Sequence, residues 1–417
     1  MGITAFPFSS VIDVPTARIL GRDDAGTGAA EALTNTEIFA ILGTGTPSAS
    51  TYLRGDGTWA SVSAGVGGST GSVDNAVLRA DGAGGATLQA SSIVITDNFT
   101  SSPNATVNHA SIQATGATTN VSVSVVPKGS GAFSLAVPDG TTTGGNVRGA
   151  NAIDLQTSRA GATQVATGLG AVAIGRQNTA AGDLSGSIAI GTNNNAAGRN
   201  AGSIAIGLNN TAGDGTQAAA YVAIGSNVST TGYWGVGIGE YLTVSGIGAV
   251  AFGLNNLASG PFADIAGGRD GNATRYGQSS KSSGMFAAQG DAQRVEFILR
   301  NKTTTNAAVT LLLDGSSSRL TIPSGKILHA TVHILGSKSD GTAVANYMRQ
   351  VCIKNVGGTT SLVGTVNTIG TDEAAGTSIA ITADNTNDAL DIAVTGIASE
   401  TWRWSATVYG IEIAYGT

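Results

Sequence analysis

The sequence of 417 residues has one cysteine, eight prolines and few charged side chains, and each shortage excludes a class of protein. The lone Cys352 cannot form a disulfide framework within one chain, which agrees with assembly in a reducing cytoplasm. Eight prolines without a Gly-X-Y run exclude collagen, although 61 residues are glycine. Only 12% of the residues are charged while 41% are hydrophobic, which argues against intrinsic disorder.

Basic clusters and long apolar runs are missing as well. The formal net charge is −6 and no Lys/Arg-rich run occurs, so we expect no nucleic-acid partner and no anionic membrane partner. No run of 18 apolar residues occurs, and Met1–Pro7 lacks the basic and apolar regions of a secretory signal. We therefore expect neither membrane insertion nor secretion by a standard signal.

The residues from which catalytic sites are built are also sparse. A glycosidase needs two carboxylates facing one groove, yet the acidic residues of the central region are isolated. A Ser-His-Asp triad is hard to assemble from His109, His329 and His333 alone, and no phosphate-binding glycine motif is present. We predict that the chain is not an enzyme and binds no cofactor or metal. A metal held by His329 and His333 on a three-fold axis is an open alternative.

A strict glycine repeat contrasts with these absences. Seven glycines are spaced seven residues apart: Gly225, Gly232, Gly239, Gly246, Gly253, Gly260 and Gly267. A coiled coil shares this period, but glycine inside a helix costs about 1 kcal/mol per site, so helix is rejected. Between the glycines, segments such as Ser187–Ile190 and Ala249–Phe252 alternate large apolar with small residues, which is typical of strands.

Two strands and two glycine corners predict one coil of a parallel β-roll. Coils have fourteen residues from Gly225 onward, and earlier coils are longer, with the extra residues expected in external loops. The glycine after each strand is expected to supply the positive φ of a corner. Two large apolar residues per coil cannot offset the ordering entropy of fourteen residues, about 1 to 2 kcal/mol each. Neighbouring chains are therefore expected to complete the core.

Two segments of the repeat resemble the head repeats of trimeric autotransporter adhesins. They are Ser187–Gly191 and Ser203–Gly207, each followed by an Ala-Gly pair. The resemblance covers the repeat region and implies a left-handed parallel β-roll shared by three chains. We expect neither the export signal nor the membrane barrel of an autotransporter, so the resemblance is architectural.

Segments on both sides of the repeat resemble the fibres of tailed bacteriophages. They are Thr51–Trp59, Asn75–Gly82, Val137–Asn146, Leu311–Ser317, Ser361–Thr365 and Ala389–Gly396. This resemblance implies a homotrimeric virion fibre that assembles in the host cytoplasm, attaches to a baseplate or tail protein through its N-terminus, and mediates host adsorption. The alternative is a purely structural fibre or baseplate appendage that spaces or docks another receptor-binding protein.

The predicted fold is an all-β, elongated homotrimeric fibre with one short helix near the N-terminus. We expect an attachment segment over 1–45, a β-rich shaft over 46–159, the roll over 160–267, a neck over 268–293 and a knob over 294–417. The helix is expected within 29–42, with Thr36 as N-cap and Gly43 after its end. Seven or so strands after residue 294 predict a knob with a jelly-roll-like β-sandwich.

Receptor contacts are predicted in this knob. Trp402 and Trp404 alternate with Arg403 in the last strand, and Tyr347 and Arg349 are further candidates. Aromatic rings stack on sugars, so the expected receptor is a host-surface glycan or an outer-membrane component. Packing in the sandwich core is the alternative for both tryptophans. Three such sites on one stalk would gain avidity.

Overall fold

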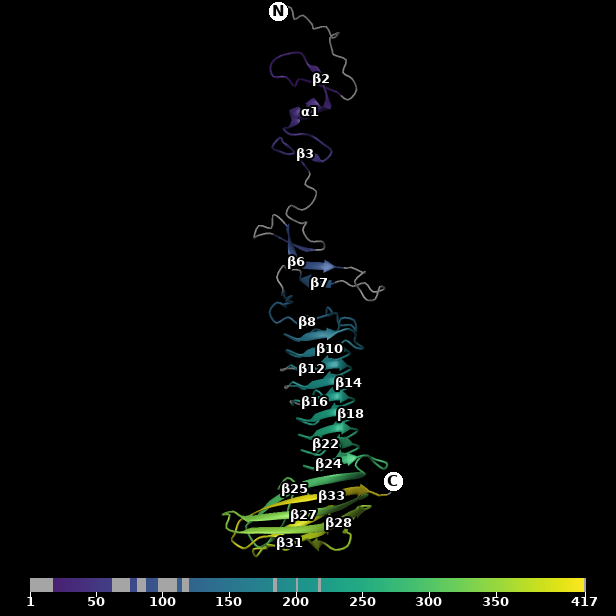
Figure 1. Ribbon diagram of the computed structural model, residues 1–417, viewed down its shortest axis with the longest axis vertical. Coiled ribbons are helices and arrows are strands. Elements are labelled where there is room, and N and C mark those ends of the chain that lie inside the picture. The colour runs from purple at the N-terminus through teal and green to yellow at the C-terminus, as the bar shows by residue number, and fades with distance from the viewer. Residues whose placement is uncertain are drawn as a thin grey trace, which may run out of the picture. The chain divides into compact units, whose positions relative to one another are not determined.

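The computed structural model describes residues 18–61, 76–80, 88–96, 111–114, 120–182, 186–199, 202–216 and 219–415. The chain forms two compact units, Met1–Val125 and Val126–Thr417. Both are built from strands, and α1 (Asn35–Leu42) is the single helix of the described part (Figure 1). The predicted all-β class with one short helix is confirmed. The expected attachment segment 1–45 lies partly outside the described residues.

The described residues of the first unit form small antiparallel sheets and α1. Strand β1 (Ile19–Gly21) pairs with β2 (Glu31–Leu33), and β3 (Thr51–Leu53) pairs with β4 (Trp59–Ser61). A third sheet contains β5 (Ala76–Ala80), β6 (Leu88–Thr96) and β7 (Ser111–Ala114).

Thr34, not Thr36, is the N-cap of α1. The Thr34 hydroxyl accepts a hydrogen bond from the Glu37 amide, and the Glu37 carboxylate accepts one from the Thr34 amide. This reciprocal capping box satisfies two backbone donors, which explains why the helix begins earlier than predicted. Gly43 follows the last helical residue as expected, but its φ of −175° is extended rather than left-handed.

The second unit begins with a β-solenoid in which every strand pairs in parallel with the strand one coil away. Its longer strands are β8 (Phe133–Ser134), β9 (Ile153–Gln156), β10 (Val172–Arg176), β12 (Ile188–Thr192), β14 (Ile204–Leu208), β16 (Val222–Ser226), β18 (Val236–Glu240), β20 (Val250–Leu254), β22 (Asp264–Arg269) and β24 (Ser279–Ser283). Residues 268–283, assigned to a neck from the sequence, form part of a further coil, and β8 and β9 precede residue 160.

A second sheet closes each coil on the opposite side. It consists of β11 (Thr179–Ala180), β13 (Asn195–Ala196), β15 (Thr211–Ala212), β17 (Ser229–Thr230), β19 (Thr243–Val244), β21 (Leu257–Ala258) and β23 (Asn272–Ala273). Residues at equivalent positions of successive coils lie in register, so Ala205 pairs with Ala223 and Ile206 with Ile224. The solenoid therefore stacks like side chains into columns.

The small residues of the repeat face inward and the large ones face outward. Ala173, Ala189, Ala205 and Ala251 have no exposed surface, and they belong to a buried cluster made largely of alanine. The alternating Val, Ile and Phe side chains of β9 to β20 lie on the other face, in two columns, and are only half-buried or exposed. We call these columns the outward stripe; they are Ile153, Val172, Ile188, Ile204, Val222, Val236 and Val250, and Leu155, Ile174, Ile190, Ile206, Ile224, Ile238 and Phe252.

The repeat glycines serve two structural needs. Gly225, Gly239, Gly253 and Gly267 lie near the ends of the longer strands and have φ between +102° and +149°, the positive φ that the sequence predicts. Gly232, Gly246 and Gly260 do not have positive φ. At each of these three, a Cβ atom would overlap backbone atoms of the next coil. Close stacking of coils, rather than turn conformation, therefore requires the mid-coil glycines.

Asparagine forms the first corner of most coils. Asn193, Asn209, Asn227 and Asn255 take the left-handed conformation with φ of 54° to 55°. The next residue in three of these coils is a buried asparagine, such as Asn210. Its amide donates to the Ile206 carbonyl and to the Gly225 carbonyl of the next coil, both at 2.8 Å, and its oxygen accepts from Val228. This asparagine ladder ties neighbouring coils together.

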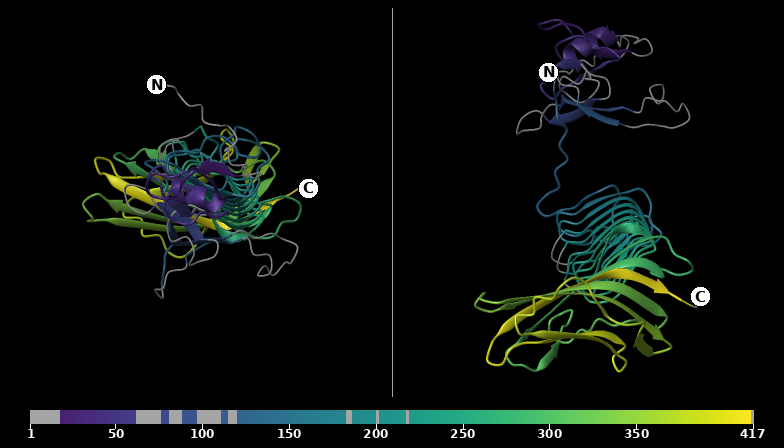
Figure 2. Two further views of the ribbon diagram at one scale, coloured as in Figure 1. Left: turned by 90° about the horizontal axis from the view of Figure 1, so that it is seen from above. Right: turned by 60° about the horizontal axis from the view of Figure 1, so that its bottom comes forward.

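The longer solenoid sheet continues into the C-terminal domain. Strand β24 pairs antiparallel with β25 (Ala292–Thr303), and the sheet then runs through β33 (Trp402–Ala414), β27 (Lys326–Lys338) and β28 (Val344–Val356) to β29 (Thr359–Leu362), while β30 (Asn367–Thr368) also pairs with β28. A second sheet contains β26 (Ala308–Thr310), β32 (Ala389–Thr395) and β31 (Ser378–Asp384). In Figure 2 these green-to-yellow sheets lie at one end of the coils. One buried hydrophobic cluster draws residues from both sheets.

A buried ion pair joins the solenoid to this domain. Arg275, next to the last short strand, donates to the Glu412 carboxylate of β33, and both side chains are at least 94% buried. The Arg275 guanidinium also lies 4.5 Å from the centre of the Phe297 ring, and Gln293 donates to Glu412. Because an unpaired buried charge is costly, this cluster fixes the last coil on the C-terminal sheet.

Candidate functional site

The two tryptophans predicted to contact a receptor lie in the core of the C-terminal domain. Trp402 and Trp404 are 0% and 2% exposed, and their rings stack with centroids 5.7 Å apart. The Trp402 indole N–H donates to Glu400, and that of Trp404 donates to Thr303. Neither ring face is open to a sugar, so burial corrects the prediction of a stacking platform here. Both tryptophans instead pack in the hydrophobic core, which was the alternative that the sequence left open.

Tyr347 and Arg349 also hold the fold together. Tyr347 is 3% exposed, its hydroxyl lies 2.7 Å from that of Thr377, and burial raises its pKa. The Arg349 guanidinium donates two hydrogen bonds of 2.7 Å to the Asp372 carboxylate, and this pairing lowers the pKa of the Asp372 carboxyl. The Arg349 guanidinium is already engaged and is poorly placed to bind a ligand directly.

We expect Arg349→Ala to raise the pKa of Asp372 toward the ordinary value of about 3.9. Because pairing depresses the folded-state pKa, the stabilisation is present above the unfolded pKa and is lost as pH falls through the folded one. For this partly exposed pair we expect a loss of about 1 kcal/mol at neutral pH and none in acid. Urea unfolding at both pH values and an NMR titration of Asp372 test this. An unchanged Asp372 pKa would contradict it, and Arg349→Lys should give an intermediate pKa.

Of the predicted receptor residues, Arg403 is the one that remains exposed. It lies beside Lys302, its partner across β25 and β33, and lines a hollow of about 360 Å³ with Arg300 and Lys302. All three cations are exposed. The hollow can therefore attract an anionic ligand.

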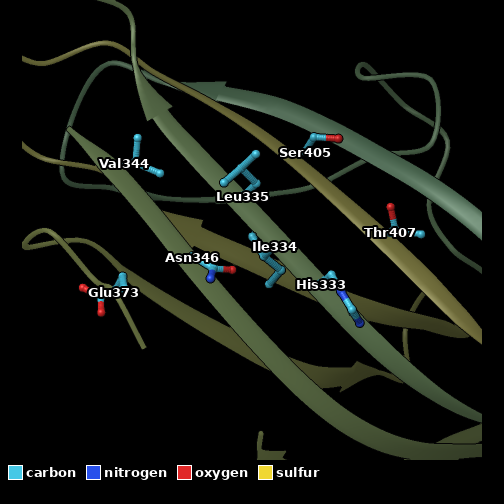
Figure 3. A pocket seen from close by; sticks show the side chains of 8 residues that line it. All are labelled: His333, Ile334, Leu335, Val344, Asn346, Glu373, Ser405 and Thr407. Carbon is cyan, nitrogen blue, oxygen red and sulfur yellow. The ribbon is translucent and has the colours of Figure 1, made fainter. Parts of the chain in front are cut away.

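A larger hollow of about 740 Å³ opens on the same outer face of the C-terminal sheet. Figure 3 shows its lining side chains, which are His333, Ile334, Leu335, Val344, Asn346, Glu373, Ser405 and Thr407. His333 and Leu335 come from β27, and Ser405 and Thr407 face them across the pairing with β33. Glu373 is held at the edge by backbone hydrogen bonds of 2.9 and 3.1 Å with Asn346 of β28.

These side chains can hydrogen-bond a polar ligand. His333, Asn346, Ser405 and Thr407 offer donors and acceptors, and Glu373 is the one carboxylate of the lining. Hydroxyl-rich ligands such as sugars need this kind of mixed lining. From the sequence, His333 was considered as a triad member or a metal ligand and was not grouped with the other lining residues. The signal that could have found them is the period of two in β27 and β33, which places these residues on one face.

The described residues contain one close group of three carboxylates. Asp23, Asp24 and Glu31 bring oxygen atoms within 4.8 Å of one another, and all three side chains are exposed. Exposed carboxylates commonly gather without a metal, so this group does not define a metal site. Among all the residues that the structure describes, no helix is long and apolar enough to cross a membrane.

Comparisons with known proteins find phage tailspikes as structural neighbours. No protein-family model matches the sequence, and no curated protein matches it. One neighbour is the tailspike protein gp49 of Acinetobacter baumannii bacteriophage Fri1, a capsular polysaccharide depolymerase, with 11% identity, a TM-score of 0.21 and coverage of 57% of this chain and 49% of that one. Another is the tailspike of Acinetobacter phage vB_ApiP_P1, with 12% identity, a TM-score of 0.20 and coverage of 59% and 50%.

The similarity to tailspikes bears on the prediction that the chain is not an enzyme. The alignments span about half of each neighbour, and at these TM-scores they assign no role to any residue of this chain. The prediction that the chain is not an enzyme is contradicted, because the Fri1 tailspike is described as a depolymerase, and it is withdrawn. The resemblance to adhesin head repeats stays a prediction.

Proposed function

We propose that this chain is one subunit of a homotrimeric bacteriophage tail fibre or spike that adsorbs to a glycan on the host surface. The outward stripe carries this proposal. It presents large apolar side chains from β9 to β20 on the outside of a solenoid whose interior holds mainly alanine, and Ile238 and Phe252 remain 38% and 37% exposed. Contiguous exposed apolar surface of this kind is typical of an interface.

If three copies are arranged around one axis, the outward stripe of each chain packs against the stripes of the other two chains and is covered. Identical parallel solenoids place Val, Ile and Phe of one chain against the same residues of the next, as a cyclic assembly requires. In this assembly the C-terminal sheets form a β-sandwich knob and the N-terminal segment attaches to a baseplate or tail protein. Assembly takes place in the host cytoplasm.

The outer face of the C-terminal sheet supports an acidic glycan as receptor. Arg300, Lys302 and Arg403 supply positive charge, and the adjoining hollow supplies hydroxyl, amide and imidazole groups. Charged, hydroxyl-rich sugars match both features. An outer-membrane component with an anionic sugar is the second form of the same ligand.

Binding of the fluorescently labelled full-length chain to capsulated Gram-negative cells, each with an acapsular derivative, tests this function. We expect saturable binding to at least one capsulated strain and its loss in the derivative. Arg300→Glu with Lys302→Glu should weaken binding, while Lys354→Glu, on β28, should not. Absence of binding across the strains would favour the alternative, a purely structural fibre or appendage. Reducing ends released in the same incubations report any cleavage of polysaccharide.

A further inference from the structure

One edge of the solenoid displays aromatic side chains at backbone positions that ordinarily exclude them. Trp234 has a φ of 56° and is 63% exposed, and Phe262 has a φ of 55° and is 53% exposed. Each occupies the corner that precedes a longer strand, β18 and β22 respectively. At the equivalent corners of neighbouring coils the residues are Gly248 and Gly277, with φ of 64° and 60°.

A bulky residue in the left-handed region is an outlier that structure alone does not favour. Such outliers persist where surrounding structure enforces them, and they cluster at functional positions. Glycine at the same corners shows that the fold does not need a ring there. The exposed rings of Trp234 and Phe262 are therefore features that folding does not explain.

The coil register sets the spacing of the rings. Gly248 donates its amide to the Tyr233 carbonyl, Phe262 to that of Ile247, and Gly277 to that of Pro261, so the four corners form one column. Trp234 and Phe262 are two coils apart, which is roughly 10 Å at the spacing of paired strands. Two sugar rings in an extended 1,4-linked chain advance by a similar distance.

The Phe262 ring covers the glycine that lies between the two aromatic corners. A Cβ atom on Gly248 would lie 2.7 Å from the Phe262 ring, which therefore leans over this glycine. Tyr276 packs on the far side of Phe262, with centroids 5.6 Å apart, and Tyr233 lies 5.9 Å from Trp234. Each exposed ring is thus braced by a tyrosine of the same edge.

A column of hydroxyl groups accompanies the rings. Thr231, Ser245, Ser259 and Thr274 lie three residues before the four corner residues, and each is exposed or half-exposed. Backbone hydrogen bonds of 2.8 to 3.0 Å from Thr231, Ser245 and Ser259 to the next coil keep this column in register with the rings. Ring faces beside hydroxyl donors and acceptors are the two chemical features that sugar recognition requires.

We propose that Trp234 and Phe262, with the adjoining hydroxyl column, form a binding strip for an extended 1,4-linked polysaccharide that runs along the solenoid. Alternate sugars stack on the two exposed rings, and the sugar between them lies against the hydroxyl column. This inference rests on the proposed function in that the ligand is a glycan, but it concerns a neutral sugar chain and places the contact on the solenoid instead of the C-terminal domain.

Calorimetric titration of the full-length chain with cellohexaose, chitohexaose and mannohexaose tests the strip. At least one hexasaccharide should bind, and Trp234→Asn and Phe262→Asn should each weaken that binding about tenfold. Asparagine accepts the left-handed conformation, so both variants should keep the native mass and melting temperature. Tyr241→Asn is the matched control, because Tyr241 has a φ of 53° and is 55% exposed at the opposite corner of the coil.

Three results would overturn the strip. The first is no binding of any hexasaccharide by the unmodified chain, and the second is unchanged binding by both variants. The third is a drop in native mass or melting temperature in Trp234→Asn and Phe262→Asn, which would show that the rings contact another copy of the chain. Retained adsorption to capsulated cells with any of these results leaves the proposed function standing, so the two failures are distinguishable.

Discussion

Gly225→Ala is expected to prevent the solenoid from folding around β16 and β18. The new Cβ atom would overlap the carbonyl oxygen of Gly239 in the next coil, and the φ of +131° is one that alanine rarely adopts. The nearest atoms all belong to the Gly239 backbone, so no side chain can move aside to relieve the overlap. Strain at such a φ adds about 1 to 3 kcal/mol to the displaced stacking, and we expect a total loss above roughly 4 kcal/mol.

Gly161→Ala is the matched control for this substitution. Gly161 begins an earlier run with the same seven-residue spacing, followed by Gly168, Gly175 and Gly182. The nearest atom to a Cβ added at Gly161 is nevertheless the Thr163 hydroxyl oxygen, at 3.9 Å. Urea unfolding followed by circular dichroism should show Gly161→Ala close to the unmodified chain and Gly225→Ala largely unfolded. Equal stability of the two variants would refute the view that coil stacking selects the glycines.

Ile206→Asp is expected to convert the trimer to single chains. Ile206 lies in the middle of the outward stripe, between Ile190 and Ile224 of the neighbouring coils. In the proposed assembly the substitution buries three carboxylates near one axis, and each buried charge costs several kcal/mol. Size-exclusion chromatography with light scattering should show the native mass falling from three times 41.1 kDa, which is 123.3 kDa, to 41.1 kDa.

Thr243→Asp provides the control for assembly. Thr243 is exposed on the shorter sheet, on the opposite side of the coil from the stripe. This variant should keep the native mass and the circular dichroism spectrum of the unmodified chain. Retention of the trimer by Ile206→Asp would show that the stripe does not lie between chains.

The repeat could be predicted from the sequence because it depends on local chemistry. Glycine at a seven-residue spacing excludes helix, and the alternation around Ala205 and Ile206 specifies strands. The same alternation does not say which face turns inward, because a period of two distributes small and large residues equally. The close approach of the two sheets decides it, since the space between them is filled mainly by alanine side chains.

The asparagine ladder was missed for a related reason. The sequence shows Asn-Asn pairs at 193–194, 209–210 and 255–256, but their meaning depends on the strand stacked one coil away. Asn210 bonds to Gly225, fifteen residues later, and this contact exists only once the coil length is known. To predict the asparagine ladder from the sequence, one would have to infer the length of each coil at the same time.

Candidate site residues were harder to predict because their partners are distant in the sequence. Trp404 donates to Thr303, 101 residues away, and Arg349 pairs with Asp372, 23 residues away. Residue type alone therefore did not distinguish a binding aromatic from a core aromatic. Trp234 shows the converse, because its exposed ring depends on a corner conformation that the glycine spacing does not reveal.

The native mass of the unmodified full-length chain, measured by light scattering, decides whether the fibre is a trimer. In the proposed trimer, two further copies of the same chain cover the outward stripe of each solenoid. We therefore expect a mass of 123.3 kDa, three times the chain mass of 41.1 kDa. A stable species of 41.1 kDa would contradict the shared fibre and leave the stripe as a surface for some other partner.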